Sequence, residues 1–133
     1  MLRKFEEDFD KPLQSYPSIT SDQVSFGRDG LLYRNGFADP FTGKVVDRYS
    51  NGNILSEQSY LRGIPHGNLF KGHSNGNPSM RALLNKGTLD GVQSRWWENG
   101  KLRDEQFWGG GKYHGKKTWD QNGRLIREEF PPP

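Results

Sequence analysis

The pair Asn-Gly recurs along the chain at an almost constant step, and this period restricts the fold more than any other feature of the sequence. The pair begins at Asn51, Asn75, Asn99 and Asn122, so the steps are 24, 24 and 23 residues. Asn-Gly between alternating segments is the strongest short signal for a β-hairpin, because both residue types tolerate the positive φ of a type I′ turn. The period therefore predicts an array of hairpins. Their tight turns are expected at Asn51, Gly52, Asn75, Gly76, Asn99, Gly100, Asn122 and Gly123.

A second glycine pattern keeps the same phase. Gly-x-x-x-Gly begins at Gly63, Gly87 and Gly111, again in steps of 24 residues. Such a group is long enough to close the opposite end of a hairpin with a loop of three to five residues. We therefore expect the second set of turns at Gly63, Gly67, Gly87, Gly91, Gly111 and Gly115.

The segments between the two sets of turns are rich in residues that favour β-strands. Counted from residue 44 to residue 130, they predict about eight strands. Hydrophobic residues make up only 31% of the chain and glycine accounts for 17 residues, so a core of ordinary thickness would lack Leu, Ile and Val. We predict an all-β fold, an elongated, twisted antiparallel sheet of tandem hairpin repeats in which each repeat contacts mainly its neighbours.

The two ends of the chain depart from the period. Leu2, Phe5 and Phe9 lie at helical spacing and Pro12 follows them, which predicts one short amphipathic helix. We expect this helix and a linker within residues 1–22, and a degenerate first repeat that acts as a cap within residues 23–43. The tandem repeats of about 24 residues then occupy residues 44–130, and residues 131–133 form a tail.

Large apolar residues occur in adjacent pairs, such as Trp96-Trp97 and Phe107-Trp108. Neighbours in a strand point to opposite faces, so both faces of the sheet carry bulky apolar groups. Either the helix covers one face and the aromatic residues form an ordinary core, or part of this surface is exposed for recognition. Trp and Arg anchor interfaces more often than other residues. The candidate partner-binding residues are Trp96, Trp97, Phe107, Trp108, Trp119, Arg95 and Arg103.

Charge is distributed unevenly along the chain. Residues 1–22 carry three basic and five acidic side chains, whereas residues 44–127 carry fourteen basic and seven acidic ones, a net charge of +7. A basic sheet with aromatic residues suits an acidic protein and, as a second candidate, anionic lipid. The basic residues are dispersed, which also fits an ordinary solvated surface, and we do not expect nucleic acid as a partner.

The residue types used in catalysis lack the arrangements that catalysis requires. His66 and His114 occupy the same repeat position, which Asp90 fills in the repeat between them, and this alternation favours hydrogen bonding within turns over metal ligation. Asp104 and Glu105 are adjacent, so a strand sends them to opposite faces. We expect no enzyme activity, no cofactor and no metal site. No apolar run reaches the length of a membrane span and the first residues lack the apolar stretch of a signal peptide, so the expected location is cytoplasmic.

The sequence resembles the bacterial variant of the MORN repeat (membrane occupation and recognition nexus), as found in the YwqK-type antitoxin-repeat family. The resemblance rests on Tyr-Ser-Asn-Gly at residues 49–52, Trp-Glu-Asn-Gly at 97–100, and Gly-x-x-His-Gly at 63–67 and 111–115. His73 stands where the motif has an aromatic residue, Asp90 stands where it has histidine, and residues 1–22 fall outside it. The resemblance implies a ribbon of antiparallel hairpins with a role in binding, in some members as antitoxins or immunity-like proteins.

We predict from these features a non-enzymatic protein–protein binding module, with antitoxin-like neutralisation of a partner as one form of that role. Two alternatives remain open. One is peripheral binding to anionic membrane lipid, and the other is a structural role through self-association at the open edges of the sheet.

Overall fold

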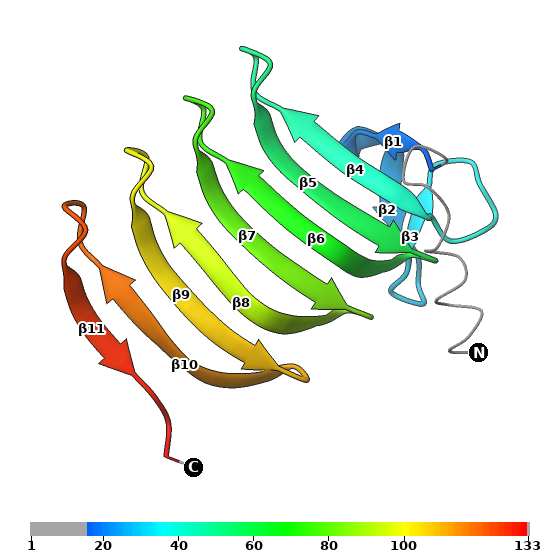
Figure 1. Ribbon diagram of the computed structural model, residues 1–133. Helices are drawn as coiled ribbons and strands as arrows, with labels where there is room; N and C mark the ends of the chain where they lie inside the picture. The colour runs from blue at the N-terminus through cyan, green and yellow to red at the C-terminus, as the bar shows by residue number, and fades with distance from the viewer. Residues whose placement is uncertain (1–15, 133) are drawn as a thin grey trace.

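A computed structural model of the chain describes residues 16–132, which form one large sheet and one small hairpin (Figure 1). The large sheet has nine strands in the order β1-β4-β5-β6-β7-β8-β9-β10-β11. A 3₁₀ helix, η2 (Ser21–Gln23), and the two-stranded hairpin of β2 (Val24–Phe26) and β3 (Leu32–Arg34) lie between β1 and β4 in the sequence. The strands of the large sheet are β1 (Ser18–Ile19), β4 (Gly43–Arg48), β5 (Ile54–Leu61), β6 (Ile64–Gly72), β7 (Pro78–Asn85), β8 (Thr88–Trp96), β9 (Leu102–Gly109), β10 (Lys112–Trp119) and β11 (Leu125–Glu129).

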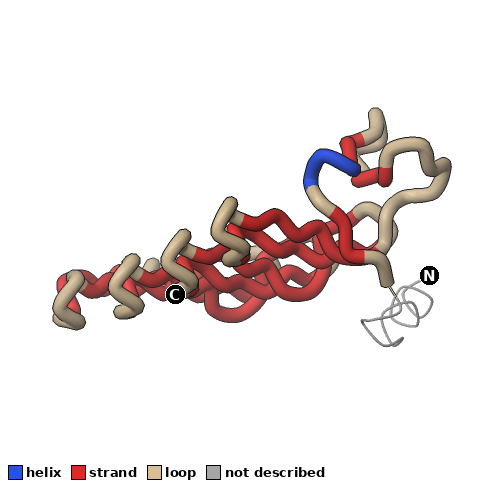
Figure 2. Tube along the Cα trace, turned by 90° about the horizontal axis from the view of Figure 1, so that it is seen from above, coloured by secondary structure: helices blue, strands red, loops and turns tan. Residues whose placement is uncertain are grey.

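The predicted all-β fold and its twisted antiparallel sheet are confirmed. The eight strands β4 to β11 pair antiparallel in sequence order, and the short strand β1 adds parallel to β4. Seen from above, the repeats form a single thin layer (Figure 2). The amphipathic helix expected around Leu2, Phe5 and Phe9 lies outside the described residues.

Each Asn-Gly hairpin closes with a three-residue loop, which corrects the predicted type I′ turns. The N–H of Tyr49 donates to Asn53 O at 2.8 Å, and the N–H of Gly52 donates to Tyr49 O at 2.9 Å. Gly52 has a φ of 91°, whereas Asn51 has no positive φ. A type I turn followed by a left-handed glycine has this geometry. The glycine therefore supplies the positive φ of the loop. The asparagine is not needed for its backbone conformation, and its role lies in side-chain hydrogen bonds.

Type I′ turns occur at the other end of the hairpins. Arg62 and Gly63 have φ values of 50° and 80° and form a two-residue loop between paired residues of β5 and β6. The same loop recurs at residues 86–87 and 110–111. The Gly-x-x-x-Gly pattern is thus not one loop, since its first glycine completes the tight turn and its second glycine lies inside the next strand.

Those second glycines mark β-bulges, which corrects their placement in turns. Gly67, Gly91 and Gly115 have φ values of 91°, 82° and 126° within β6, β8 and β10, where the register with the preceding strand shifts. A Cβ atom on Gly115 would lie 2.5 Å from Glu129 O. Glycine is required here both for the left-handed φ and for the close approach of the neighbouring backbone.

In the repeats, the asparagine of each Asn-Gly turn except the last, at residues 122–123, joins its own turn to the following one. Asn51 Oδ1 accepts the N–H of Asn53 at 3.0 Å, and Asn51 Nδ2 donates to Ser74 O in the next turn at 2.7 Å. These bonds satisfy backbone groups that a hairpin loop otherwise leaves to water. The bond to the next turn recurs from Asn75 to Glu98 O at 2.8 Å and from Asn99 to Gln121 O at 3.0 Å. We call this series of bonds the turn ladder.

Within residues 16–132, one cluster of buried hydrophobic residues forms, and it lies at the amino-terminal end of the array. Ile19, Leu32 and Phe41 are buried together, with Val45 and Tyr60 packed against them. The cap is also bonded to the β5–β6 turn, because the N–H of Leu32 donates to Gly63 O at 3.0 Å and the N–H of Gly63 donates to Phe41 O at 2.7 Å. Further along the sheet most large side chains are only half-buried, because no second layer from the described residues covers either face.

Removal of one rung of the turn ladder should destabilise the protein. Asn75→Ala loses one hydrogen bond within its own turn and one to Glu98 O, so we expect the free energy of unfolding to fall by about 1 kcal/mol in urea titrations. Asn122→Ala is the matched control, because Asn122 makes no side-chain hydrogen bond within residues 16–132. Equal losses for the two variants would contradict the role assigned to the ladder.

A second variant tests the type I′ turn at residues 110–111. Gly110 has a φ of 58° and a Cβ atom there would meet nothing within 4 Å. Gly110→Asn introduces the residue that this turn prefers and restricts the unfolded chain, so the free energy of unfolding should rise by about 0.5 kcal/mol. Gly115→Asn, at the crowded bulge, should instead lower it. A destabilised Gly110→Asn protein in the same urea titration would overturn the turn assignment.

Candidate functional site

The strand register divides the predicted partner-binding residues between two faces of the sheet. Phe107 stacks on Phe130 with ring centroids 6.1 Å apart. Trp108 lies on the opposite face, where it is 5.5 Å from the Tyr113 ring and its Nε1 donates to Gln106 Oε1 at 3.3 Å. We refer to these as the Phe107 face and the Trp108 face. The candidates therefore do not form one continuous aromatic patch.

Several of the remaining candidates meet at the edge formed by the Asn-Gly turns. A surface hollow of about 570 Å³ lies there, which we call the turn-edge hollow. The Arg103 guanidinium lies 4.8 Å from the centroid of the Trp97 ring, within the range of a cation–π interaction. The residues that line the hollow are His73, Trp96, Trp97, Glu98, Asn99, Arg103 and Gln121.

A β-bulge directs Arg103 into this position. Arg95 pairs with Asp104 and Trp96 pairs with Leu102, so Arg103 is the extra residue on β9. Arg103 Nε also lies 3.7 Å from Asp104 Oδ2. The bulge thus brings a basic side chain from the strand to the edge of the sheet, beside Trp97.

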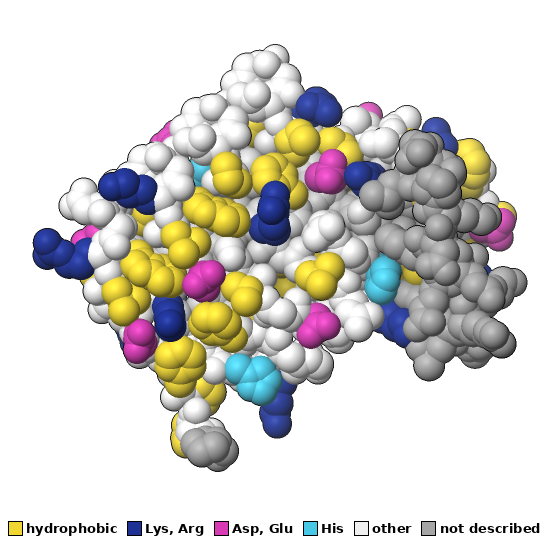
Figure 3. Space-filling view, viewed as in Figure 1, with side chains coloured by type: hydrophobic (Ala, Val, Ile, Leu, Met, Phe, Trp, Pro, Cys, Tyr) yellow, Lys and Arg dark blue, Asp and Glu magenta, His cyan; other side chains and the backbone are white. Residues whose placement is uncertain are grey.

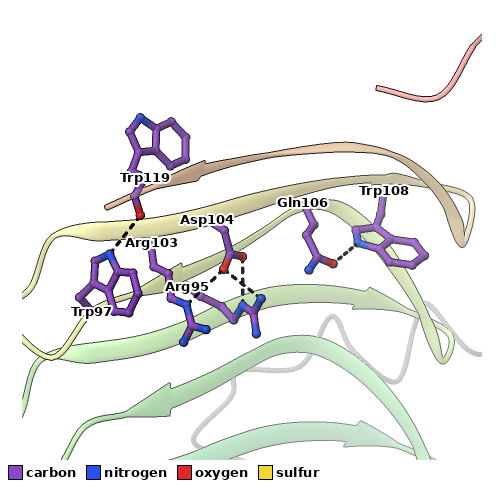
Figure 4. Close-up of polar contacts among 7 residues, drawn as sticks. All are labelled: Arg95, Trp97, Arg103, Asp104, Gln106, Trp108 and Trp119. Carbon is purple, nitrogen blue, oxygen red and sulfur yellow. Dashed lines mark hydrogen bonds and ion pairs between the residues drawn. The ribbon is translucent and has the colours of Figure 1, made fainter. Parts of the chain in front are cut away.

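Arg95 has a structural role at the same carboxylate. Its Nη2 and Nε lie 2.9 and 3.0 Å from the two carboxylate oxygens of Asp104, whose side chain is only 3% exposed (Figure 4). A buried carboxylate needs such a bidentate partner. The Arg103 side chain is 46% exposed. Of the two predicted arginines, Arg103 is therefore the one available to a ligand.

The four indoles have different surroundings. Trp97 Nε1 donates to the backbone oxygen of Trp119 at 3.2 Å, whereas the ring of Trp119 points away from Trp97 (Figure 4). Trp96 lines the turn-edge hollow, and Trp108 lies on the Trp108 face. All four indoles are half-buried and none is fully buried. Because Trp97 is partly exposed, recognition of a partner through its ring stays a prediction.

Sequence reasoning missed the part that His73 plays. Tyr49 Oη donates to Gly72 O at 2.8 Å, and His73 Nε2 lies 2.9 Å from Trp96 O one repeat later. Because a carbonyl oxygen only accepts, Nε2 of His73 carries the proton. Tyr49, His73 and Trp97 thus form one column of side-chain donors. The sequence signal for this role was the shared repeat position, because all three residues that occupy it can donate a hydrogen bond from the side chain.

His66 confirms the expected role in turn hydrogen bonding. Its Nδ1 accepts the N–H of Lys86, in the following type I′ turn, at 2.9 Å. One repeat earlier, Thr42 Oγ1 accepts the N–H of Arg62 at the same distance. Burial, and then the positive charge of Lys86, lower the pKa of His66 below its ordinary value. His66 is therefore neutral at physiological pH and serves as an acceptor.

The hollow suits recognition through a flat apolar ring and an exposed cation. Within residues 16–132, no group of three or more His, Asp or Glu side chains is close enough to hold a metal ion. In the same part of the chain no helix has the length and apolar character needed to cross a bilayer. An exposed guanidinium above an indole can bind a carboxylate while the ring contacts neighbouring apolar atoms.

Comparison with known proteins identifies one hairpin of the array. Residues 89–108 match the family described as MORN repeat variant. The matched segment includes the Asn99-Gly100 turn together with Trp97 and Arg103, and it supports a MORN-repeat protein. MORN repeats often take part in protein or membrane-lipid binding. No curated protein and no solved structure matches the chain.

Protonation of His66 should destabilise the fold. The depressed pKa means that its contribution is complete above the ordinary value of about 6.5 and is lost as pH falls through the lower folded-state pKa. His66→Asp, which copies Asp90 at the equivalent position, keeps an acceptor in this range. We expect the loss of stability between neutral pH and pH 5 to be smaller in this variant than in the wild type.

The control for this experiment is His114→Asp. His114 occupies the same repeat position, but the following type I′ turn that would donate to it does not occur within the described residues. Urea unfolding at several pH values should therefore show a wild-type pH dependence for His114→Asp. A wild-type dependence for His66→Asp as well would show that the bond to Lys86 does not govern the response.

Proposed function

We propose that this protein is a non-enzymatic module that binds an acidic segment of another protein at the turn-edge hollow. The observation that carries the proposal is the pairing of the exposed Arg103 guanidinium with the half-buried Trp97 ring. Such a pair offers a carboxylate-binding group beside an apolar surface, and Trp and Arg dominate the binding energy of many interfaces. The indole is held in place by its bond to Trp119 O, which reduces the entropy lost on binding.

The charge of the repeats supports an acidic partner. The net charge of +7 over residues 44–127 favours association with acidic surfaces and predicts weaker binding as salt rises. Four exposed basic residues flank the Asn-Gly turns, namely Arg48, Lys101, Arg103 and Arg124. The turn edge therefore presents more than one cation to an approaching partner.

Neutralisation of a toxin or effector is the finer form of this proposal. It draws on the resemblance to the bacterial YwqK-type antitoxin repeats, in which the module would cover the active surface of its target, and we place that role in the cytoplasm. Anionic lipid is the second candidate, because exposed cations beside half-buried indoles also suit an interfacial membrane site. Self-association through the open edge of β11 is the third.

The experiment is an affinity pulldown with Arg103→Ser from a lysate of the organism that encodes the chain. Serine occurs naturally as Ser79 at the equivalent bulge, so the variant should fold. We expect a partner protein to be recovered by the wild type at low salt and lost at high salt. Its recovery by Arg103→Ser should fall about tenfold, the loss expected for an interface arginine.

Lys112→Ser is the matched control, since it removes an exposed cation from the opposite end of the hairpins, beside the type I′ turn at residues 110–111. It should retain the partner. Equal recovery by Arg103→Ser and the wild type would refute binding at the hollow. Flotation with phosphatidylserine vesicles forms the second arm, and binding there without a protein partner would favour the lipid alternative.

A further inference from the structure

The Phe107 face carries three rows of side chains that run across the strands. Directly paired residues point to the same face, so the register defines each row. The charged residues of the middle row alternate in sign, and the row comprises Glu57, Phe70, Arg81, Ser94, Glu105, Lys117 and Glu128. Figure 3 shows a face of the molecule on which hydrophobic side chains spread across the strands with single acidic and basic groups between them.

The two outer rows are largely apolar, and no second layer formed by residues 16–132 covers them. On the side of the Asn-Gly turns, Trp96 pairs with Leu102 and Trp119 pairs with Leu125. On the other side Val92 pairs with Phe107. Exposure of large apolar groups is high, with Leu83 at 45%, Val92 at 44%, Leu125 at 45% and Phe130 at 55%. Contiguous apolar surface of this kind marks an interaction site.

We propose that the Phe107 face packs against the same face of a second copy of this chain, about a twofold axis that runs parallel to the strands near Ser94. Rotation about this axis reverses the order of the middle row. Arg81 of one copy then lies opposite Glu105 of the other, and the symmetry repeats this pair. Phe70 lies opposite Lys117 of the second copy, which permits a cation–π contact.

The outer rows match under the same rotation. Gly72 of one copy lies opposite Trp119 of the other, so one of the two tryptophans of this row faces a residue without a side chain. The other, Trp96 on the axis strand, lies opposite Trp96 of the second copy. In the other outer row Leu83 lies opposite Phe107. Bulky groups thus meet small or apolar ones, as the interdigitated packing of two sheets requires.

Charge also selects this axis over the other face-to-face arrangement. A twofold axis perpendicular to the strands along the middle row would place Arg81 opposite Arg81 and Glu105 opposite Glu105. Neither residue has an ion-pair partner within residues 16–132 that would offset the repulsion. Within the middle row the only like pair is Glu57 with Glu128, which lies three strands from the axis, where the angle between two twisted sheets moves the rows apart. In the outer row Asp90, which pairs with Leu83 close to the type I′ turn at residues 86–87, lies opposite Asp90 of the second copy.

The area available is that of a stable dimer. Strands β5 to β11 at a spacing of about 4.8 Å, and three rows about 6.8 Å apart, give a face of roughly 700 Å² per copy. Specific interfaces bury about 800 Å² per partner. Arg103 contacts Asp104 on the Trp108 face, so the dimer goes beyond the proposed partner binding and leaves Arg103 accessible, although Trp96 belongs to both surfaces.

Charge reversal tests the proposal by sedimentation equilibrium of the full chain. We expect the wild type to have twice the monomer mass of 15.3 kDa at submillimolar concentration. Arg81→Glu and Glu105→Arg should each weaken the dimer by about tenfold or more, because each creates two like-charge pairs. A mixture of the two variants should form a heterodimer, in which both pairs are attractive, and the double variant R81E/E105R should dimerise as the wild type does.

Lys71→Glu is the control, since it makes the same charge change as Arg81→Glu at an exposed position on the Trp108 face, and it should remain dimeric. Circular dichroism confirms that each variant is folded. A monomeric wild type would overturn the proposal. So would dimers that persist in both single variants, or a mixture in which the heterodimer does not form.

Discussion

The hydrogen bond between an asparagine side chain and the backbone of the following turn is the interaction on which the array depends. A sheet with one layer buries little apolar surface, so the repeats need a further means to hold their register. Asn51, Asn75 and Asn99 supply it with one bond each to a carbonyl oxygen of the next hairpin. The donor column of Tyr49, His73 and Trp97 adds a parallel series of bonds. These polar contacts thus supply part of the stabilisation that packing against a second layer gives to the sheets of a β-sandwich.

This arrangement leaves apolar and charged groups free on both faces. The ion pair of Arg95 with the buried Asp104 carboxylate fixes the strand beside the Asn99-Gly100 turn, and the bulge next to it presents Arg103 at the edge. Three features of one hairpin, a bulge, a buried carboxylate and a tethered indole, therefore create the turn-edge hollow. The same hairpin contributes Trp96 and Phe107 to the Phe107 face, and Trp96 also lines the turn-edge hollow, so the surfaces assigned to a partner and to a second copy adjoin at this residue.

The sequence period was sufficient for the fold because glycine and asparagine mark every hairpin end. It was not sufficient for the turn types, since the asparagine is selected by a bond to a residue 23 positions later, which a dipeptide rule does not consider. Trp97 and Arg103 could be proposed from residue type alone. Their separation from Trp108 and the structural role of Arg95 could not be predicted, because both depend on the register of the strands. The register in turn depends on the exact loop lengths and on where the bulges lie.

The turn ladder also bears on how such a chain changes in length. Every internal turn both gives a bond to its successor and receives one from its predecessor, so consecutive units are interchangeable at their junctions. Duplication or loss of one complete unit would leave each remaining junction satisfied, whereas an insertion of a few residues within a strand would break two junctions at once. Insertions and deletions of whole repeats are therefore tolerated better than shorter ones. The length of the binding surface can change by one repeat at a time while the fold stays the same.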